Sequence, residues 1–299
     1  MKVLVFGSLN IDYVYSVEHF VRPGETIASS DRQVFCGGKG LNQAISFAKY
    51  GLETWMSGAV GKDDSDVLID ALNKANVNTS LVKHKNGPSG HTIIQNTPDG
   101  ENNIILFGGA NQSLTKEDVD ETLTHFEKGD LLILQNEINM IPYIMEKAYS
   151  KGMRIVLNPS PMNEKILEMP LEYAEYLVLN EIEAGGILSI DDTNGEILMN
   201  KLREKFPNTK IVLTLGESGS LYSDDKSSCH CGIFSVKPVD TTGAGDTFMG
   251  YFIGEVTSGN SPKDALRTAS AASAIAVSRK GASVSIPTRT EVIDFLSKH

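Results

Sequence analysis

The segment Leu131-Leu-Ile-Leu134-Gln135-Asn-Glu137 places a short, continuous apolar run directly before polar side chains. Similar runs recur along the chain, and most are separated by segments with the apolar spacing of amphipathic helices. They are Val3–Phe6, Ile155–Leu157, Tyr176–Leu179 and Ile211–Leu213. Apolar runs without alternation are typical of strands that helices cover on both faces. The sequence therefore predicts an α/β fold with a doubly wound, mostly parallel sheet and helices on both faces.

Two segments interrupt this alternation of strands and helices, at residues 12–36 and 90–107. In the second, His91–Gln95 and Asn103–Phe107 flank Pro98-Asp-Gly100 in the manner of a β-hairpin. We expect both segments to supply strands of one small sheet outside the core. Such a sheet can act as a lid over a site or as a dimer surface. No repeat or linker divides the chain, so one α/β domain over residues 1–299 is expected.

Composition limits the classes of ligand and compartment. Lys and Arg number 27 against 38 for Asp and Glu, and the net charge of −11 argues against binding to nucleic acid or anionic membranes. The three cysteines, Cys36, Cys229 and Cys231, contain no C-x-x-C pair and are too few for a disulfide scaffold. The first apolar run is shorter than a signal-peptide core, and no segment is long enough to span a membrane. A cytoplasmic protein is therefore expected.

Polar residues follow each of the five apolar runs. Ligands of doubly wound sheets bind beyond the carboxyl ends of the strands, so these residues are the first candidates for a site. The same residue types also form ordinary turns and helix caps. Five clusters in equivalent positions nevertheless favour a shared site. The clusters begin at Gly7, Gln135, Asn158, Asn180 and Thr214.

The sharpest motif is Asp240-Thr-Thr-Gly243-Ala-Gly245-Asp246-Thr-Phe-Met-Gly250, a glycine-containing turn that opens onto a helix. Its glycines allow backbone N–H groups to converge at the helix start, where the positive end of the helix dipole binds anions. An isolated Asp246 would simply stabilise the helix start. Beside a phosphate site, an ionised carboxylate can instead accept the proton of an attacking hydroxyl. The motif therefore predicts phosphoryl transfer from ATP with Asp246 as the base.

A second glycine-rich motif, Cys36-Gly37-Gly38-Lys39-Gly40-Leu-Asn42-Gln43, also leads into a helix. Its glycines could form only a tight turn, but Lys39 and Asn42 add a cation and an amide that can bind sugar hydroxyls beside Asn10 and Asp12. The chain contains no Walker A motif, no G-x-G-x-x-G after the first strand and no G-x-S-x-G. The six histidines have no metal-ligand spacing. These absences argue against P-loop, dinucleotide-binding, serine hydrolase and metalloenzyme classes.

Together the two motifs resemble the signatures of the ribokinase-like carbohydrate kinases, also called the phosphofructokinase B type, and the resemblance covers nearly the whole chain. It implies the ribokinase-like fold with Asp246 as catalytic base. It also implies an anion hole formed by Gly243, Ala244 and Gly245. The sugar-contacting positions that it implies are Asn10, Asp12, Gly38, Lys39, Asn42 and Glu137. The ATP-site positions that it implies are Asn180, Thr214, Gly216, Gly219 and Ser270.

The resemblance further implies two metal ions. Glu183, in Asn180-x-x-Glu183, matches a carboxylate that helps to organise Mg²⁺ through water. The positions that match a monovalent cation (K⁺) site are Asp240, Thr242, Ala276, Arg279, Gly281 and Ser285. Such an ion would brace the anion-hole turn from behind.

Three positions depart from the usual pattern of the family. Leu41 and Gly243 stand where alanine is common, and Met249 stands where asparagine is frequent. The implied catalytic residues are unchanged. These departures therefore bear on the identity of the sugar more than on the reaction.

The expected reaction is transfer of the γ-phosphate of ATP to a primary hydroxyl of a free sugar, foremost D-ribose to D-ribose 5-phosphate. A pocket rich in polar side chains favours a highly hydroxylated ligand, and Lys39 alone would be a poor match for a sugar phosphate. Deoxyribose, fructose or a nucleoside are the alternatives, and a nucleoside would need an apolar shelf such as Tyr13, Phe35 or Phe107. From another class, a catalytically silent sugar-binding regulatory protein remains open, although the intact Asp246 argues against it. Exposed edges of the small sheet suggest a homodimer.

Overall fold

The computed structural model describes residues 1–299, and its main sheet has nine strands. In chain order they are β1 (Val3–Phe6), β4 (Thr54–Gly61), β5 (Asn78–Lys85), β8 (Leu131–Leu134), β9 (Arg154–Leu157), β10 (Tyr176–Asn180), β11 (Lys210–Thr214), β12 (Ser220–Ser223) and β13 (Ser228–Cys231). Across the sheet their order is β13-β12-β11-β10-β9-β8-β1-β4-β5. All neighbours from β11 to β5 are parallel, whereas β12 and β13 pair antiparallel at one edge. The predicted mostly parallel sheet is confirmed.

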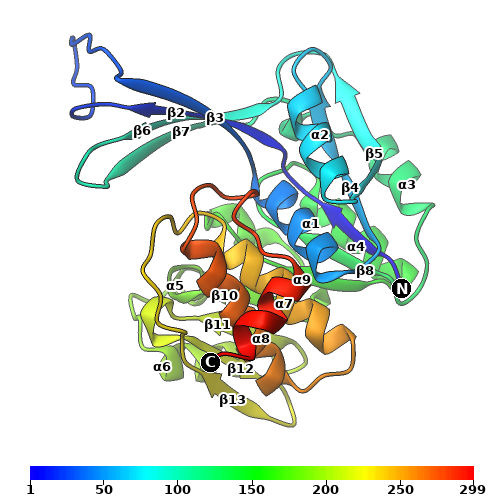
Figure 1. Ribbon diagram of the computed structural model, residues 1–299. Coiled ribbons are helices and arrows are strands. Elements are labelled where there is room, and N and C mark those ends of the chain that lie inside the picture. The colour runs from blue at the N-terminus through cyan, green and yellow to red at the C-terminus, as the bar shows by residue number, and fades with distance from the viewer.

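Helices cover both faces of this sheet, as Figure 1 shows. They are α1 (Lys39–Tyr50), α2 (Asp66–Lys74), α3 (Lys116–Leu123), α4 (Ile141–Lys151), α5 (Glu181–Leu188), α6 (Gly195–Lys205), α7 (Ala244–Thr257), α8 (Pro262–Val277) and α9 (Arg289–Leu296). Alternate residues of β1 enter two separate buried clusters. Val5 packs with residues of α1, α7 and α8, and Phe6 packs with residues of α3 to α6. Both faces are therefore apolar, and none of the helices is long and apolar enough to cross a membrane.

The sequence prediction included β1 and β8 to β11 but missed the other four strands of the main sheet. Strand β4 is almost wholly buried, yet Ser57, Gly58 and Gly61 interrupt its apolar residues. Strands β5 and β13 lie at the two edges of the sheet and are partly exposed, so they retain polar residues. A continuous apolar run identifies a strand only where large side chains are needed on both faces.

A separate small sheet has four strands in the order β3-β2-β6-β7. They are β2 (Asn10–Ser16), β3 (Asp31–Gly37), β6 (Gly90–Asn96) and β7 (Asn102–Phe107). Strands β6 and β7 form the predicted hairpin. In Figure 1 this sheet projects from the main body of the protein, and every residue of β7 is exposed. The expected small sheet outside the core is therefore present.

The reversal of strand order in the main sheet lies at β1, which pairs with β4 on one side and with β8 on the other. In doubly wound sheets such a reversal opens a crevice beyond the carboxyl ends of the strands. The polar clusters that follow β1 and β8 to β11 all lie on this side. The small sheet starts there too, because β2 follows β1 after three residues, Gly7 to Leu9.

Candidate active site

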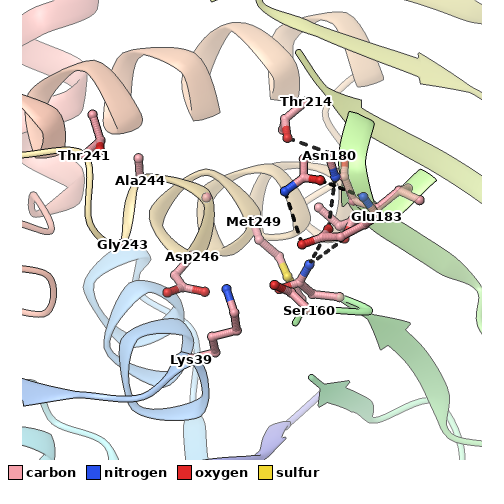
Figure 2. A pocket seen from close by; sticks show the side chains of 14 residues that line it. Lys39, Ser160, Asn180, Glu183, Thr214, Thr241, Gly243, Ala244, Asp246 and Met249 are labelled. Carbon is pink, nitrogen blue, oxygen red and sulfur yellow. Dashed lines mark hydrogen bonds between the residues drawn. The ribbon is translucent and has the colours of Figure 1, made fainter. Parts of the chain in front are cut away.

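A cavity of about 240 Å³ lies between the carboxyl ends of β9, β10 and β11 and the start of α7 (Figure 2). Each strand contributes the polar residue that ends or follows it, so three of the sequence-predicted clusters meet here. The cavity is lined by Lys39, Asn158, Ser160, Val178, Leu179, Asn180, Glu183, Thr214, Thr241, Gly243, Ala244, Gly245, Asp246 and Met249. We call it the phosphate-side cavity.

The turn before α7 has the features of an anion site. Gly243 adopts the left-handed conformation (φ 75°, ψ 4°), and no side chain caps the helix that follows it. A β-carbon at Gly243 would be strained there and would lie 3.3 Å from Ala282 Cα. Ala244 N donates to the carbonyl oxygen of Thr241 (3.2 Å), whereas the N–H groups of Gly245 and Asp246 are left for water or an anionic ligand, and the helix dipole favours the anion.

Asp246 lies in the first turn of α7 and is only 6% exposed. Its Oδ2 accepts a hydrogen bond from Asn42 Nδ2 (3.0 Å), and its Oδ1 accepts one from Gln43 Nε2 (2.9 Å). Both donors belong to α1, so the second glycine-rich motif is placed against the first. The carboxylate is therefore fixed by amides at the wall of the cavity.

Lys39 is the cation of this cavity. Figure 2 shows its amine and the carboxylate of Asp246 pointing into the same space. Burial lowers the pKa of Lys39, but the carboxylates of Asp246, Glu137 and Glu183 outweigh it and raise that pKa above its usual value. The side chain consequently stays protonated and can face a second anion.

Glu183 stands at the opposite wall, at the start of α5. It forms a capping box with Asn180: Asn180 N donates to Glu183 Oε2 (3.0 Å), and Glu183 N donates to Asn180 Oδ1 (2.9 Å). Asn180 Nδ2 also donates to Glu183 Oε1 (3.2 Å). The carboxylate is 5% exposed and oriented on both oxygens. It is a hard oxygen donor at the edge of the cavity.

A second cavity, of about 510 Å³, lies between the small sheet and residues 238–242 and 280–282. Asp12, on β2, lines it, and Thr241 lines both cavities, so the two adjoin. Asp12 Oδ1 accepts a hydrogen bond from Thr92 Oγ1 (2.6 Å). Burial raises the pKa of Asp12 from 3.8 to about 6, although the Thr92 hydroxyl opposes the shift and Glu137 adds to it. We call this the sugar-side cavity.

The remaining predicted sugar contacts line neither cavity. Asn10 is buried, and its Oδ1 accepts a hydrogen bond from Asn111 Nδ2 (2.7 Å). Gly38 immediately precedes α1, where Glu137 accepts hydrogen bonds from Lys39 N (3.1 Å) and from a serine hydroxyl. Asn42 Oδ1 is buried without a partner. A substrate hydroxyl could satisfy that acceptor, which would otherwise be costly to bury.

The predicted ATP-site residues fall into two groups. Asn180 and Thr214 line the phosphate-side cavity, whereas Gly216, Gly219 and Ser270 do not. Gly216 lies two residues beyond Thr214, and a β-carbon on Gly219 would lie 2.1 Å from the carbonyl oxygen of Cys231. Ser270 Oγ lies 4.0 Å from the sulfur of the same cysteine. Gly219 and Ser270 therefore both border Cys231, outside the cavity.

The residues implied in cation binding lie behind the anion turn. The Asp240 carboxylate accepts hydrogen bonds from the backbone N–H groups of Thr242 (2.9 Å) and Gly281 (2.9 Å) and so joins the turn to the loop after α8. Burial raises the pKa of Asp240, but these hydrogen bonds outweigh it and lower that pKa. Arg279 N donates to the carbonyl oxygen of Ala276 (3.0 Å), and Ser285 Oγ donates to another carbonyl of the loop. The guanidinium of Arg279 is directed elsewhere, to Glu291 (2.7 Å).

Sequence reasoning gave no role to two side chains that the structure places in this site. Gln43 bonds Asp246, and Asn158 Nδ2 lies 3.4 Å from Glu183 Oε2. Both residues lie in segments that were candidates for a site on sequence grounds. Asn158 directly follows a strand, and Gln43 ends the second glycine-rich motif. Their partners depend on how α1 packs on α7, and no local pattern carries that information.

Comparison with known proteins gives consistent results. A family model described as pfkB family carbohydrate kinase matches residues 1–289. The ribokinase of Staphylococcus aureus (strain COL) is 33% identical over 300 residues, which cover 97% of this chain and 98% of that protein. The deoxyribokinase of Salmonella typhi is 31% identical, with 99% of both chains covered. The structure of Arabidopsis thaliana ribokinase complexed with ribose and ATP superposes with a TM-score of 0.88 at 28% identity, and covers 99% of this chain and 98% of that one.

Proposed function

The chain belongs to the pfkB family of carbohydrate kinases, and we propose that it transfers the γ-phosphate of ATP to the primary hydroxyl of D-ribose, giving ADP and D-ribose 5-phosphate. One observation carries the proposal: the carboxylate of Asp246 stands beside the uncapped, glycine-led start of α7, in a cavity that also holds a lysine. Full-length similarity to ribokinases supports the choice of sugar.

In the proposed reaction Asp246 accepts the proton of the primary hydroxyl as its oxygen attacks the γ-phosphorus. The bond from that phosphorus to the bridging oxygen breaks, and the electron pair leaves with ADP. The N–H groups of Gly243, Ala244 and Gly245 stabilise charge on the migrating phosphoryl group. Lys39 faces the same group from α1. We assign Lys39 to the phosphoryl group as well as to the sugar, because it lines the phosphate-side cavity.

The sugar would span the two cavities. Its primary hydroxyl reaches Asp246, and its other hydroxyls meet Asn10, Asp12, Asn42 and Glu137 near Gly38. The unpartnered Asn42 Oδ1 supports this placement, since it needs a donor that the protein does not supply. 2-Deoxyribose is the second candidate, because a deoxyribokinase is 31% identical over the full chain. The two sugars differ by one hydroxyl, so discrimination depends on whether a buried polar group is left unpaired.

ATP would place its phosphates at the anion turn and at Asn180 and Thr214, with Gly216, Gly219 and Ser270 farther along the nucleotide. A Mg²⁺ ion bound to the phosphates would neutralise their charge. The Glu183 oxygens already accept hydrogen bonds, and no three His, Cys, Asp or Glu side chains cluster as metal ligands. The residues therefore fit an ion held mainly by phosphates and water, with Glu183 orienting that water.

A K⁺ ion would bind behind the anion turn, at Asp240, Thr242, Ala276, Arg279, Gly281 and Ser285. The site would use backbone carbonyls together with the Asp240 carboxylate and hydroxyl groups. Such hard oxygen donors fit the chemistry of the ion, and the Arg279 guanidinium does not intrude because it bonds Glu291. By ordering the turn that contains Gly243, the ion would raise turnover rather than sugar affinity.

We further propose that residues 1–299 form one domain whose small sheet covers the sugar, and that two copies associate through this sheet in the cytoplasm. The exposed apolar residues of the sheet support association: Val34, Ile93, Ile104, Ile105, Leu106 and Phe107. All three cysteines are free thiols, in keeping with a reducing compartment. A monodisperse monomer by light scattering at working concentration would contradict the dimer.

A substrate panel tests the proposed reaction. ADP release is measured with D-ribose, 2-deoxyribose, fructose, a nucleoside and ribose 5-phosphate, with potassium or with sodium at equal ionic strength. We expect the highest kcat/KM with D-ribose and a higher kcat in potassium. A clear preference for the nucleoside would contradict the assignment. Calorimetric binding of ATP and ribose without ADP release would instead favour the silent binding protein.

A further inference from the structure

Gln43 links two carboxylates of the phosphate-side cavity, and we infer that it is a positioning residue that orients Asp246 and couples it, through Asn158, to Glu183. This inference rests on the proposed function, in which Asp246 is the base and Glu183 orients the water around a phosphate-bound ion. It assigns a role in the reaction to Gln43, which lines neither cavity, and to Asn158, which lines the phosphate-side cavity and has no role in that scheme.

The Gln43 amide is held on both sides. The residue is fully buried (0% exposed) on α1. Its Nε2 donates to Asp246 Oδ1 (2.9 Å) and to Asn158 Oδ1 (3.3 Å), and its Oε1 accepts from Gln135 Nε2 (2.6 Å). Three of its four hydrogen-bonding positions are therefore in use.

The direction of these bonds is determined by the carboxylates at the two ends. An ionised carboxylate only accepts hydrogen bonds, so the nitrogen of Gln43 must face Asp246, and its oxygen is left for Gln135. Asn158 has its oxygen toward Gln43, and its Nδ2 donates to Val178 O (2.9 Å) and to Glu183 Oε2 (3.4 Å). Every hydrogen bond in the series from Asp246 through Gln43 and Asn158 to Glu183 has a compatible donor and acceptor. Exchanging the nitrogen and oxygen of the Gln43 amide alone would break this series.

Close packing of two helices makes this reach possible. On α7, Gly250 faces α1, and a β-carbon there would lie 2.1 Å from Ser46 Oγ. Ser46 Oγ also donates to the carbonyl oxygen of Thr247 (3.1 Å). Because Gly250 is one turn beyond Asp246 and Ser46 is one turn beyond Gln43, the backbones approach closely beside the site. A short amide side chain then spans the gap to Asp246.

The arrangement gives Gln43 two effects. With Asn42 it supplies one N–H to each oxygen of Asp246, which fixes the direction in which a hydroxyl proton is accepted. Through Asn158 it also limits the orientation of Glu183, which lies at the start of α5. A displacement of Gln43 therefore disturbs the base and the ion-orienting carboxylate together.

The first test replaces Gln43 by residues of similar size. Gln43→Glu puts a carboxyl group next to Asp246, and the acidic limb of the kcat profile, which Asp12 affects less than it affects KM, should move up by about one pH unit or more. Gln43→Met removes the donor, and kcat should fall about 10- to 100-fold because the base is misoriented. The charged groups facing the site, Lys39, Glu137 and Glu183, are unchanged in both variants. An acidic limb that stays in place in Gln43→Glu would overturn the inference.

The second test measures coupling. Asn158→Leu removes the link to Glu183 but leaves the bond from Gln43 to Asp246. If the amides act as one series, the double variant Gln43→Met/Asn158→Leu loses no more kcat than the worse single variant. The gain in ADP affinity on adding Mg²⁺, measured by calorimetry, should also shrink several-fold in Gln43→Met. The coupling would be overturned if the kcat losses of the two single variants multiplied in the double variant and the Mg²⁺-dependent gain in ADP affinity were unchanged in Gln43→Met.

A control separates positioning from general stability. Asn139 donates through Nδ2 to Leu114 O (2.8 Å) and accepts from Leu114 N (3.2 Å), away from both cavities. Asn139→Leu should lower the melting temperature without moving the acidic limb. If the unaltered protein phosphorylates no sugar, the proposed function fails. If it is active and Gln43→Glu behaves as Asn139→Leu does, the positioning role alone fails. Should Gln43→Glu not fold, the kcat of Gln43→Met and its calorimetric comparison with the unaltered protein decide the inference.

Discussion

The two adjoining cavities are built from different parts of the molecule. The phosphate-side cavity is formed by strand ends of the main sheet and the start of α7, and its carboxylates are fixed by hydrogen bonds from buried amides. The sugar-side cavity is roofed by the small sheet, whose outer strand β7 is exposed throughout. The fold thus separates the groups that we propose for phosphoryl transfer from the small sheet that we propose to cover the sugar.

This division has a physical basis. Stabilising a migrating phosphoryl group requires dipoles that are already oriented, and strand ends packed between two helical layers provide them. Sugar recognition requires that the sugar can enter and leave the site. Displacing a sheet with few helical contacts costs less free energy than displacing a core strand. Changes on the phosphate side should therefore reduce kcat, and changes on the sugar side should mainly affect KM or assembly.

The largest effect is expected from Asp246→Asn. The amide keeps the size of the side chain but cannot accept the hydroxyl proton, so kcat should fall about 10²- to 10⁴-fold. ATP and ribose affinities, measured by calorimetry, should change little. Turnover close to that of the unaltered protein would remove Asp246 from the role of base.

A smaller but still large loss is expected from Gly243→Val. A β-branched residue is strained at φ 75° and would press on Ala282, which displaces the anion-binding N–H groups. We expect about a 10²-fold loss of kcat. Gly129→Val is the matched control, because Gly129 has φ 89° and open space around its β-carbon position. If both variants lost turnover equally, backbone strain rather than the anion turn would be the cause.

On the sugar side, Asp12 should make sugar binding pH-dependent. Its pKa of about 6 lies above the ordinary 3.8, so the carboxylate that accepts sugar hydroxyls is lost as the pH falls below about 6. KM for ribose should then rise several-fold while kcat changes less. Asp12→Asn should raise KM about tenfold and abolish this pH dependence. An unchanged acidic rise of KM in that variant would contradict the assignment.

The raised pKa of Asp12 also predicts the sign of its effect on stability. Because the folded protein binds the Asp12 proton more tightly than the unfolded chain, this group lowers stability as the pH rises from about 4 to 6. Asp12→Asn should therefore raise the melting temperature at pH 7 more than at pH 4. Equal melting shifts at both pH values would argue against a buried, ionised Asp12.

The smallest effect on chemistry is expected on the outer strand. Ile105 on β7 is 63% exposed, so Ile105→Lys should leave kcat within a few-fold while converting a dimer to a monomer in light scattering. Lys201→Ala, at an exposed position of α6 on the main sheet, serves as the control. A large loss of kcat in an undissociated protein would mean that the two regions are less separate than the structure indicates.

The sequence was sufficient for the parts of this molecule that depend on local pattern. The five central apolar runs predicted β1 and β8 to β11, because a strand covered on both faces must be apolar throughout. Strand β4 was not predicted because its small residues Ser57 and Gly58 interrupt its apolar run. The glycine turn at Gly243 and the adjacent Asp246 were recognisable because helix-start chemistry is encoded within a few residues.

The rest of the site was not predictable from local pattern. The bonds of Gln43 and Asn158 depend on the close approach of α1 and α7, which is a property of packing. Asn180 was predicted at the ATP site and Glu183 as a carboxylate that helps to organise Mg²⁺, and the structure adds that they also cap α5. Placing Gly219 and Ser270 beside Cys231 likewise required the fold, since these residues come from different elements.

The proposed reaction depends on delivery of phosphate to the primary hydroxyl by the start of α7. The most direct measurement uses ribose labelled with ¹³C at its primary carbon, incubated with ATP and followed by ³¹P nuclear magnetic resonance. We expect a phosphomonoester resonance split by the labelled carbon, which should appear at least about 10²-fold more slowly with Asp246→Asn. An unsplit phosphomonoester signal, or inorganic phosphate alone, would contradict it.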